Sequence, residues 1–491
     1  MTSTAHPFWQ PDALCLALKG TWLARTPPLG TPIFGAAIDT RQLKPGEIFF
    51  ALQGEKTNGH AFLHQAREAQ AGLAVVDDPA AAGTLPEGLA IVQVDDARAA
   101  LSRLAQAWRS LLCSTRFIAI TGSNGKTTTT RLLQACLQDS FTVRSSRRSF
   151  NNDLGVPLTI LSVRPTDHCV ICEVGANEPG EIEPLSRIIK PCAVVITHIG
   201  CAHMQGFGSR DAVAKEKASL VRHLRPFDDR TPGLIVSPAE NPALDQQLSA
   251  WLAHESPHDM THIRVGESPD ADCVLSSIVQ ESTHITWRLN GQPMRMAGLG
   301  THNASNAAAA VTVARWCGVE DAAIFQALDA FTMPDMRLNL HEYGDIRVLN
   351  DAYNANPDSM LAGLRTLKAV ANKDSRRVAI LGDMLELGEI QTQAHQTIAR
   401  AIVTEELADC VILIGPRAAA MAPILQKTTR EVHLFDPISA KNQTAEHVTR
   451  LLCPGDTVLL KGSRCMQLER ILEAHAPNQS HAHPAHTHTR V

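Results

Sequence analysis

Apolar residues occur along the chain in short blocks that alternate with longer amphipathic stretches. Blocks rich in β-branched residues predict buried strands, because such side chains pack well on a pleated sheet. We predict strands at residues 46–52, 74–76, 90–94, 117–120, 169–174, 192–197, 377–381, 410–414, 432–435 and 456–461. Between these strands, apolar residues follow helical spacing, which predicts helices at residues 62–71 and 97–112 among others. This alternation predicts an α/β fold with mostly parallel sheets.

The length of 491 residues corresponds to about three domains. We predict a small α/β domain at residues 1–112, a central domain at 113–330 and a Rossmann-like domain at 331–475. The last of these lacks the glycine fingerprint that is typical of dinucleotide binding. Residues 476–491 form a His-rich tail, which we expect to be a disordered polar end rather than a metal site.

Residues 117–130, F-I-A-I-T-G-S-N-G-K-T-T-T-T, combine a predicted strand, a glycine-rich turn and the start of a helix. Backbone N–H groups of such a turn attract phosphate oxygens, and a following lysine and threonine can add a charge and a Mg²⁺ ligand. The motif is shorter than the usual P-loop, because Ile120 stands where the first glycine would be. We predict a nucleotide phosphate site at Gly122, Ser123, Asn124, Gly125, Lys126, Thr127 and Thr128.

Polar side chains also follow other predicted strands of the central domain. Glu173 lies at the end of one strand, and His203 closes the polar segment after the next. Because the carboxyl ends of parallel strands meet at one edge of a sheet, both could reach a metal held by nucleotide phosphates. A capping carboxylate and a hydrogen-bonded turn histidine are the alternatives. Asn303, which precedes an Ala-rich helix, could likewise be a plain N-cap.

Composition and charge narrow the functional classes. The net charge of −5, without a Lys/Arg-rich block, argues against a nucleic-acid partner. No apolar run approaches the ~20 residues of a membrane span, and the first residues lack the pattern of a signal peptide. We therefore expect a cytoplasmic chain without membrane insertion. The twelve cysteines are scattered, and Cys169 and Cys172 fit buried free thiols better than a metal or redox motif.

Several of these stretches, in this order, resemble the Mur ligases, the ATP-dependent amide ligases of peptidoglycan assembly. The resemblance is carried by T-G-S-N-G-K-T-T from Thr121, E-x-G-A-N from Glu173 and H-N-x-x-N from His302. Lys217, downstream of His203, matches a further basic position of the family. Some positions depart from the family pattern, among them Gln205, which stands where an acid usually follows the metal-binding histidine.

Other stretches are similar to one branch of that family, the branch that adds D-alanyl-D-alanine to UDP-N-acetylmuramoyl-tripeptide. They are F-N-N-D-L-G-V-P from Phe150, G-A-N-E-P-G-E-I from Gly175, Y-N-A-N-P from Tyr353 and G-D-M-L-E-L-G from Gly382. The resemblance therefore implies these two compounds as substrates, with ATP and Mg²⁺ as cofactors. We expect a monomer.

The resemblance also implies which residues hold the nucleotide and the metal. Lys126 and Arg337 would bind the ATP phosphates, and Thr127 would bind the nucleotide's Mg²⁺. Glu173, His203 and a carbamate on Lys217 would bind a second Mg²⁺. Asn303 and Asn306 would face the base, and Asp351 would face the ribose. Of these, Lys126, Lys217 and Arg337 would be catalytic. From chemistry alone, Lys217 would be a surface lysine.

A second set of residues would hold the UDP-muramoyl substrate. Asp39 and Arg41 resemble the family's uridine-nucleotide domain, so the domain at 1–112 would bind this substrate. Asn151 and Asn152 would lie along its muramoyl part. From chemistry alone, the cluster at residues 39–41 needs no role beyond that of a turn.

The implied reaction is amide ligation through an acyl phosphate, in which ATP activates the tripeptide carboxylate before the dipeptide amine attacks. Another Mur-type ligase or a folylpolyglutamate synthase is a related alternative. A P-loop phosphotransferase would explain Lys126 and Thr127 but not the three-domain layout or the segment at Tyr353. An inactive nucleotide-binding scaffold is disfavoured, because every expected catalytic side chain is present.

Overall fold

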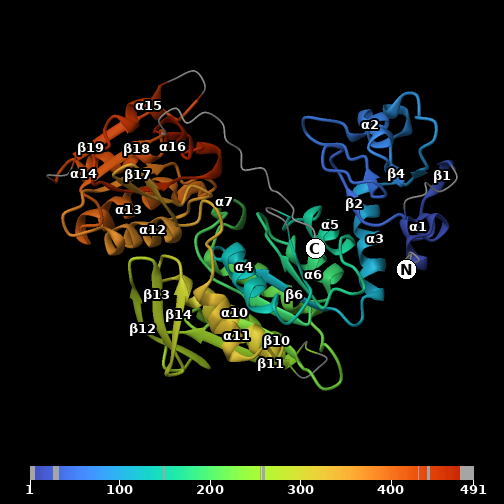
Figure 1. Ribbon diagram of the computed structural model, residues 1–491, viewed down its shortest axis with the longest axis horizontal. Coiled ribbons are helices and arrows are strands. Elements are labelled where there is room, and N and C mark those ends of the chain that lie inside the picture. Colours follow the sequence, from blue (N-terminus) through green and yellow to red (C-terminus); the bar gives the residue numbers. More distant parts are fainter. Residues whose placement is uncertain are drawn as a thin grey trace. The chain divides into compact units, whose positions relative to one another are not determined.

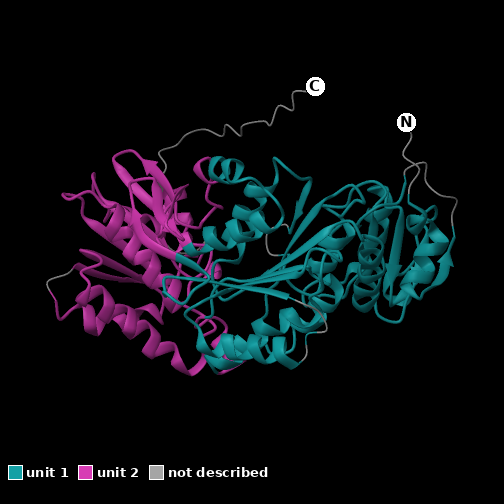
Figure 2. Cartoon of the chain, turned by 90° about the horizontal axis from the view of Figure 1, so that it is seen from below, with its two compact units in different colours: residues 1–199, 209–274, 305–327 teal, residues 200–208, 275–304, 328–491 magenta. Residues whose placement is uncertain are grey.

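The computed structural model describes residues 6–25, 32–146, 150–254, 256, 260–428, 431–439 and 443–475. The predicted His-rich tail at 476–491 lies outside the described residues. The chain divides into two compact units (Figure 2), namely unit 1 with residues 1–199, 209–274 and 305–327, and unit 2 with residues 200–208, 275–304 and 328–491. Within the described ranges, none of the helices has the length and apolar character needed to cross a membrane.

The first sheet lies within unit 1 and has the order β1-β5-β4-β3-β2. Only the β1–β5 pair is antiparallel. The elements are α1 (Pro11–Leu18), β1 (Thr21–Ala24), β2 (Ala36–Ala37), β3 (Ile48–Phe50), α2 (Leu63–Glu68), β4 (Leu73–Val76), β5 (Ile91–Gln93) and α3 (Ala97–Leu111). The three strands and two helices predicted for this region are confirmed, most of them with shorter bounds.

Helix α3 illustrates how the local sequence sets an element of this region. Its N-cap Asp96 accepts a hydrogen bond from the Ala99 N–H at 2.8 Å, which satisfies one of the free donors of the first turn. Leu101, Leu104 and Trp108 follow helical spacing and are fully buried. The Trp108 indole N–H donates to the Val163 carbonyl at 2.9 Å, which ties α3 to the central region.

The central sheet contains the predicted P-loop strand. Its order is β14-β13-β12-β11-β10-β9-β6-β8-β7. The parallel strands are β6 (Arg116–Thr121), β7 (Val143–Ser145), β8 (Cys169–Glu173), β9 (Ala193–Ile196), β10 (Gly233–Pro238) and β11 (Met260–Gly266). The helices of this region are α4 (Lys126–Leu137), α5 (Gly155–Leu161), α6 (Ile182–Ile189), α8 (Arg210–Ala218), α9 (Pro242–His254), α10 (Asn303–Trp316) and α11 (Asp321–Asp329). The predicted strands β6, β8 and β9 are thus confirmed, and they lie next to one another in the order β9-β6-β8.

The sequence pattern did not predict strands β12 (Cys273–Gln280), β13 (His284–Leu289) and β14 (Gln292–Ala297). Strand β12 pairs with β11 in parallel, and the pairs β12–β13 and β13–β14 are antiparallel. Along β13, the buried residues Ile285, Trp287 and Leu289 alternate with more exposed ones, whereas β12 has one fully buried residue, Leu275. Strands of this kind lack the continuous apolar run that identifies a buried parallel strand.

The third sheet lies in unit 2 and has the order β15-β16-β20-β17-β18-β19, with only β15–β16 antiparallel. Its strands are β15 (Asn339–Tyr343), β16 (Ile346–Asn350), β17 (Arg377–Gly382), β18 (Cys410–Ile414), β19 (Glu431–Phe435) and β20 (Thr457–Lys461). Helices α12 (Pro357–Val370), α13 (Gln391–Thr404) and α14 (Ala422–Leu425) cover one face, and α15 (Thr444–Thr449) and α16 (Arg470–His475) cover the other (Figure 1). The predicted Rossmann-like arrangement is confirmed.

Each of the three predicted domains therefore contains one sheet, and the predicted α/β class is confirmed. The predicted domain boundaries stay predictions.

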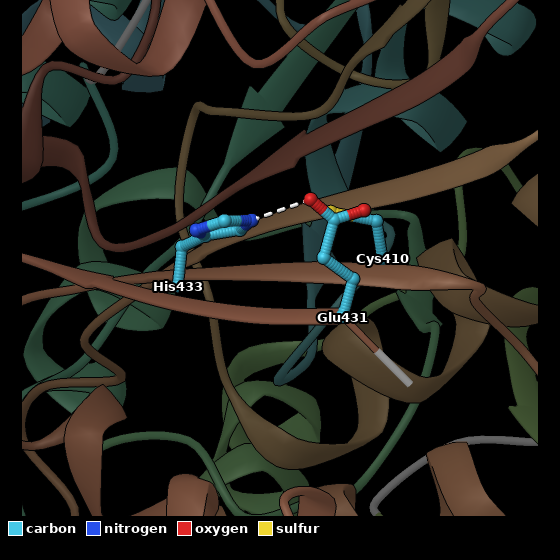
Figure 3. A group of neighbouring side chains, drawn as sticks. All are labelled: Cys410, Glu431 and His433. Carbon is cyan, nitrogen blue, oxygen red and sulfur yellow. Dashed lines mark hydrogen bonds and ion pairs between the residues drawn. The ribbon is translucent and has the colours of Figure 1, made fainter. Parts of the chain in front are cut away.

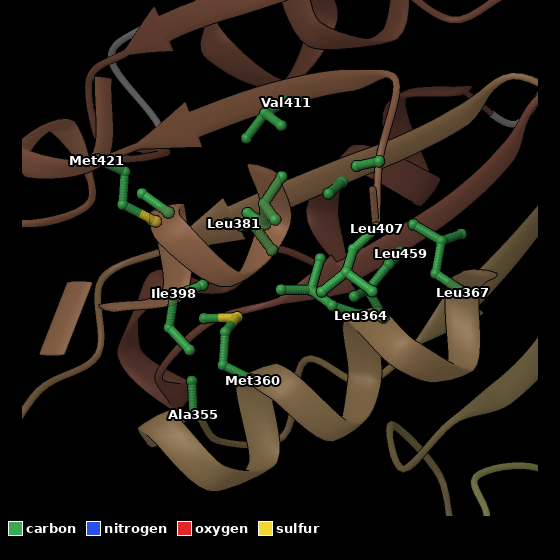
Figure 4. Close-up of a cluster of buried hydrophobic side chains, with 14 of the residues drawn as sticks. Ala355, Met360, Leu364, Leu367, Leu381, Ile398, Leu407, Val411, Met421 and Leu459 are labelled. Carbon is green, nitrogen blue, oxygen red and sulfur yellow. The ribbon is translucent and has the colours of Figure 1, made fainter. Parts of the chain in front are cut away.

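The core under α12 offers a test of packing. Leu364 is fully buried among the side chains of α12, α13 and the sheet (Figure 4). We expect Leu364→Ala to lower the free energy of unfolding by about 2–5 kcal/mol, because it removes buried apolar surface and leaves a cavity. Urea unfolding followed by circular dichroism would measure this. The control, Leu434→Ala, changes a leucine that is 46% exposed and should shift stability by at most about 0.5 kcal/mol. Equal effects of the two variants would contradict the packing shown here.

Candidate functional site

The predicted phosphate loop lies between β6 and α4, and its glycines adopt the backbone that such a turn needs. Gly122 and Gly125 have φ of 147° and 84°, where side chains are strained. A Cβ on Gly122 would collide with the Thr197 hydroxyl, and one on Gly125 with the Asn306 side chain. Lys126 begins α4, and its Nζ donates to the Gly122 carbonyl at 2.7 Å. Its ammonium group therefore lies directly over the turn.

The segment after β9 forms hydrogen bonds with this loop. The Thr197 hydroxyl donates to the carbonyls of Thr121 and Asn124, and the Ser123 N–H donates to the His198 carbonyl at 2.7 Å. These bonds connect the turn to the segment that follows β9. The loop is therefore held in shape by the neighbouring strand.

Glu173 joins two of the predicted site residues. Its carboxylate accepts hydrogen bonds from the Thr127 hydroxyl at 2.8 Å and from the Asn151 amide at 3.0 Å. Glu173 ends β8, which pairs with β6 so that Glu173 lies opposite Ile120. The prediction that Glu173 and the phosphate loop share one sheet edge is thus confirmed.

Lys217 is buried, with 2% of its surface exposed, whereas Lys215 on the same helix α8 is exposed. The two lysines therefore point in different directions, and the alternative of a surface lysine at 217 is wrong. Burial, together with the positive charge of Lys126, lowers the pKa of Lys217 to about 7. A substantial part of this amine is therefore neutral and nucleophilic near pH 7.

Two of the predicted asparagines pack in helix α10. Asn306 accepts from the buried Thr129 hydroxyl at 3.3 Å and lies against Gly125. Asn303 is the first residue of α10, and its amide donates to the Leu299 carbonyl at 2.7 Å, which fastens the turn before the helix. Thr128, in the first turn of α4, is buried.

In unit 2, His203 precedes the short helix α7 (Met204–Phe207) in a left-handed conformation with φ of 55°. Its Nδ1 lies 2.6 Å from a carboxylate oxygen of Glu386, and this hydrogen bond holds the pKa of Glu386 below its usual value. The Gln205 N–H donates to the Glu386 carbonyl at 3.0 Å. Glu386, from a distant segment of the chain, is therefore the acid that contacts this histidine.

Arg337 and Asp351 lie in unit 2, close to the carboxyl end of β16. The Arg337 guanidinium stacks 4.1 Å above the centre of the Tyr353 ring. Asp351 directly follows β16 and forms an ion pair with Lys461, whose side chain is 2% exposed. These contacts hold both predicted residues in defined positions.

The residues predicted for the UDP-muramoyl substrate lie on turns of unit 1. Arg41 donates two hydrogen bonds to the Asp39 carboxylate, at 2.9 and 2.7 Å, and the arginine bond lowers the pKa of Asp39. The Asn152 side chain accepts from the Gly155 N–H at 2.9 Å at the start of α5. Asp39 and Arg41 therefore bind each other within a turn, which agrees with the alternative that this cluster is only a turn. A substrate role for them stays a prediction.

The arrangement in unit 1 fits a nucleotide phosphate with Mg²⁺. Glycines at the two tight positions let backbone N–H groups approach an anion, and Lys126 supplies the opposite charge. The Thr127 hydroxyl and the Glu173 carboxylate lie side by side and offer the oxygen ligands that Mg²⁺ prefers.

Four residues that were not predicted as site residues each contact a predicted one. They are Thr197, Glu386, Tyr353 and Lys461, which contact Asn124, His203, Arg337 and Asp351, respectively. Thr197, Glu386 and Lys461 lie at or after the carboxyl end of a predicted strand, and Tyr353 follows β16, which was not predicted. That position was the available signal.

Models of protein families match this chain along most of its length. Residues 32–109 match the model "Mur ligase family, catalytic domain", residues 120–314 match "Mur ligase middle domain", and residues 336–464 match "Mur ligase, glutamate ligase domain". The three matches follow the order of the three sheets.

Individual relatives match over nearly the full length. The UDP-N-acetylmuramoyl-tripeptide–D-alanyl-D-alanine ligase of Bacillus subtilis (strain 168) is 34% identical over 461 residues, which cover 93% of this chain and 96% of the relative. A crystal structure of MurF from Acinetobacter baumannii has a TM-score of 0.82 at 27% identity, with 95% of this chain and 98% of that chain covered. A MurF ligase structure from Thermotoga maritima, solved in complex with ADP, shares the fold with a TM-score of 0.74 at 22% identity, over 90% of this chain and 97% of that chain. Matches of this extent establish that the protein belongs to the Mur ligase family.

Proposed function

We propose that this chain is an ATP-dependent ligase that adds D-alanyl-D-alanine to UDP-N-acetylmuramoyl-tripeptide, which forms the pentapeptide precursor of peptidoglycan. The observation that carries the proposal is the cluster in unit 1, where Lys126, Thr127, Glu173 and a buried Lys217 belong to one region around the phosphate loop. The substrates are those in the name of the Bacillus subtilis relative.

The reaction would have two steps. A carboxylate oxygen of the tripeptide attacks the γ-phosphorus of ATP, the bond to the bridging oxygen breaks, and ADP leaves. The amine of D-alanyl-D-alanine then attacks the carbonyl carbon of the acyl phosphate. The carbon–oxygen bond breaks, phosphate leaves, the nitrogen loses a proton, and an amide results.

The residues of this chain would mainly position and neutralise charge. Lys126 would hold the γ-phosphate, and Arg337 would approach the phosphates from the C-terminal domain. Thr127, Glu173, His203 and a carbamate on Lys217 would hold Mg²⁺, which neutralises phosphate charge when bound. Asn303 and Asn306 would lie near the base and Asp351 near the ribose.

Asp39, Arg41, Asn151 and Asn152 would hold the UDP-muramoyl substrate. We further propose that the chain is a monomer and that it lies in the cytoplasm. The proposed compartment agrees with the twelve free cysteines, because reducing compartments keep thiols unpaired.

The proposal is tested by measuring phosphate release from ATP with each substrate alone and with both together. We expect turnover only when UDP-N-acetylmuramoyl-tripeptide and D-alanyl-D-alanine are both present, because the amine completes the cycle. Turnover with a nucleotide dipeptide and a single amino acid, and none with D-alanyl-D-alanine, would place the chain in another branch. Phosphate transfer that needs no amine would favour a phosphotransferase.

A further inference from the structure

A cluster of three potential metal ligands lies away from the residues discussed so far. Cys410, Glu431 and His433 each offer one ligand atom, and these three atoms lie within 4.8 Å of one another. The side chains point toward a common position on neighbouring strands β18 and β19 (Figure 3). Among the described residues, no other group of three or more His, Cys, Asp and Glu side chains meets this criterion.

The sheet register places the three side chains on one face. Cys410 lies opposite Glu431, and Ile412 lies opposite His433, in the parallel pair of β18 and β19. Residues two apart in a strand share a face. Cys410, Glu431, His433 and Ile412 therefore lie next to one another on the same face of the sheet. The ligand atoms are thus carried by rigid backbone and not by a loop.

The hydrogen bonds around Glu431 leave one of its oxygens directed at the cluster. Its Oε2 accepts from Arg376 at 2.9 Å, whereas its Oε1 lies 2.7 Å from His433 Nε2. Arg376 is itself held by two hydrogen bonds to Asp456, whose side chain is 2% exposed. Arg376 therefore orients the Glu431 carboxylate. Because Asp456 balances the charge of Arg376, this guanidinium repels a nearby cation less than an unpaired guanidinium would.

We propose that Cys410, Glu431 and His433 form a binding site for a divalent transition metal of the Zn²⁺ type, with water completing the coordination. A thiolate with an imidazole and one carboxylate is a ligand set that suits Zn²⁺, whereas Mg²⁺ and Ca²⁺ prefer oxygen ligands alone. On binding, the Cys410 thiol loses its proton to solvent and the metal replaces the hydrogen bond between His433 and Glu431. The ion reaches the site through Glu431 and His433, whose side chains are 46% and 29% exposed.

This site is separate from the proposed reaction. Cys410 and Glu431 begin their strands, whereas Lys461 ends β20 and Asp351 directly follows β16. In a parallel sheet, the amino ends of the strands and their carboxyl ends lie on opposite sides of the sheet. The metal would link the edge strand β19 to β18, so binding should raise the thermal stability of the chain and leave phosphate release unchanged.

Co²⁺ and Zn²⁺ added to the full-length, reduced and metal-free chain test the proposal. We expect one equivalent of Co²⁺ to produce a near-ultraviolet sulfur-to-cobalt absorption band that Zn²⁺ abolishes, and Zn²⁺ to raise Tm. Cys410→Ser and His433→Gln should each lose the band and weaken Zn²⁺ binding at least about 10-fold. Cys453→Ser, which changes an exposed thiol of the same unit, should keep both properties.

The sulfur band also separates this site from the His-rich tail, since residues 476–491 contain no cysteine. Because Cys410 is buried, circular dichroism must first show that Cys410→Ser is folded, and if it is not, His433→Gln decides the matter. Absence of the band in the unmodified chain would overturn the proposal, and so would a band and a Tm increase that persist in His433→Gln.

Discussion

Lys126→Ala is expected to lower the rate of phosphate release by on the order of 10²-fold or more, with the fold intact. The Lys126 ammonium lies over the turn between Gly122 and Gly125, where phosphate charge would develop in the transition state. Loss of a contact that strengthens in the transition state raises the barrier by several kcal/mol. Steady-state phosphate release with both substrates, beside circular dichroism, would measure the effect.

The matched control is Lys215→Ala, which removes an exposed ammonium from helix α8 of the same unit. It should retain the turnover of the unmodified chain. The Lys126 variant should also raise the pKa of Lys217, because the charge of Lys126 contributes to lowering it. A folded Lys126→Ala variant with normal turnover would exclude the phosphate loop from the reaction.

Lys217→Ala is the second variant for which we expect a large loss of activity, at least about 10²-fold. The proposed carbamate forms when the neutral amine attacks the carbon of CO₂ and loses a proton, and a pKa of about 7 makes that amine available near neutral pH. Its anionic oxygens would bind Mg²⁺, which an ammonium group would repel. Short carboxylates such as acetate should restore part of the activity by occupying the same position.

Lys215→Ala serves again as the control, since it lies two residues away on the exposed side of α8. Isotopically labelled CO₂ gives a readout besides activity, because a carbamate signal in the nuclear magnetic resonance spectrum should be present in the control and absent in Lys217→Ala. Normal turnover of Lys217→Ala at limiting Mg²⁺ would show that the carbamate assignment is wrong.

The fold class and the phosphate loop could be predicted because both depend on local sequence. Buried parallel strands require continuous apolar runs, and the turn after β6 requires glycines at 122 and 125 where φ is positive. Glu173 could be assigned to the same edge because parallel strands present their carboxyl ends together. The half-exposed strands β12 to β14 were not predicted, because buried and more exposed positions are mixed along them and a continuous apolar run is missing.

The sequence by itself determined that Lys215 and Lys217 point in different directions, because that follows from the period of the helix. Only the tertiary structure decided which of the two is buried, since this depends on what packs against α8. The same holds for Glu386 beside His203 and for Cys410 beside Glu431 and His433. Such neighbours are distant along the chain, and they meet because strand register and packing are set by the whole domain, on which no local pattern reports.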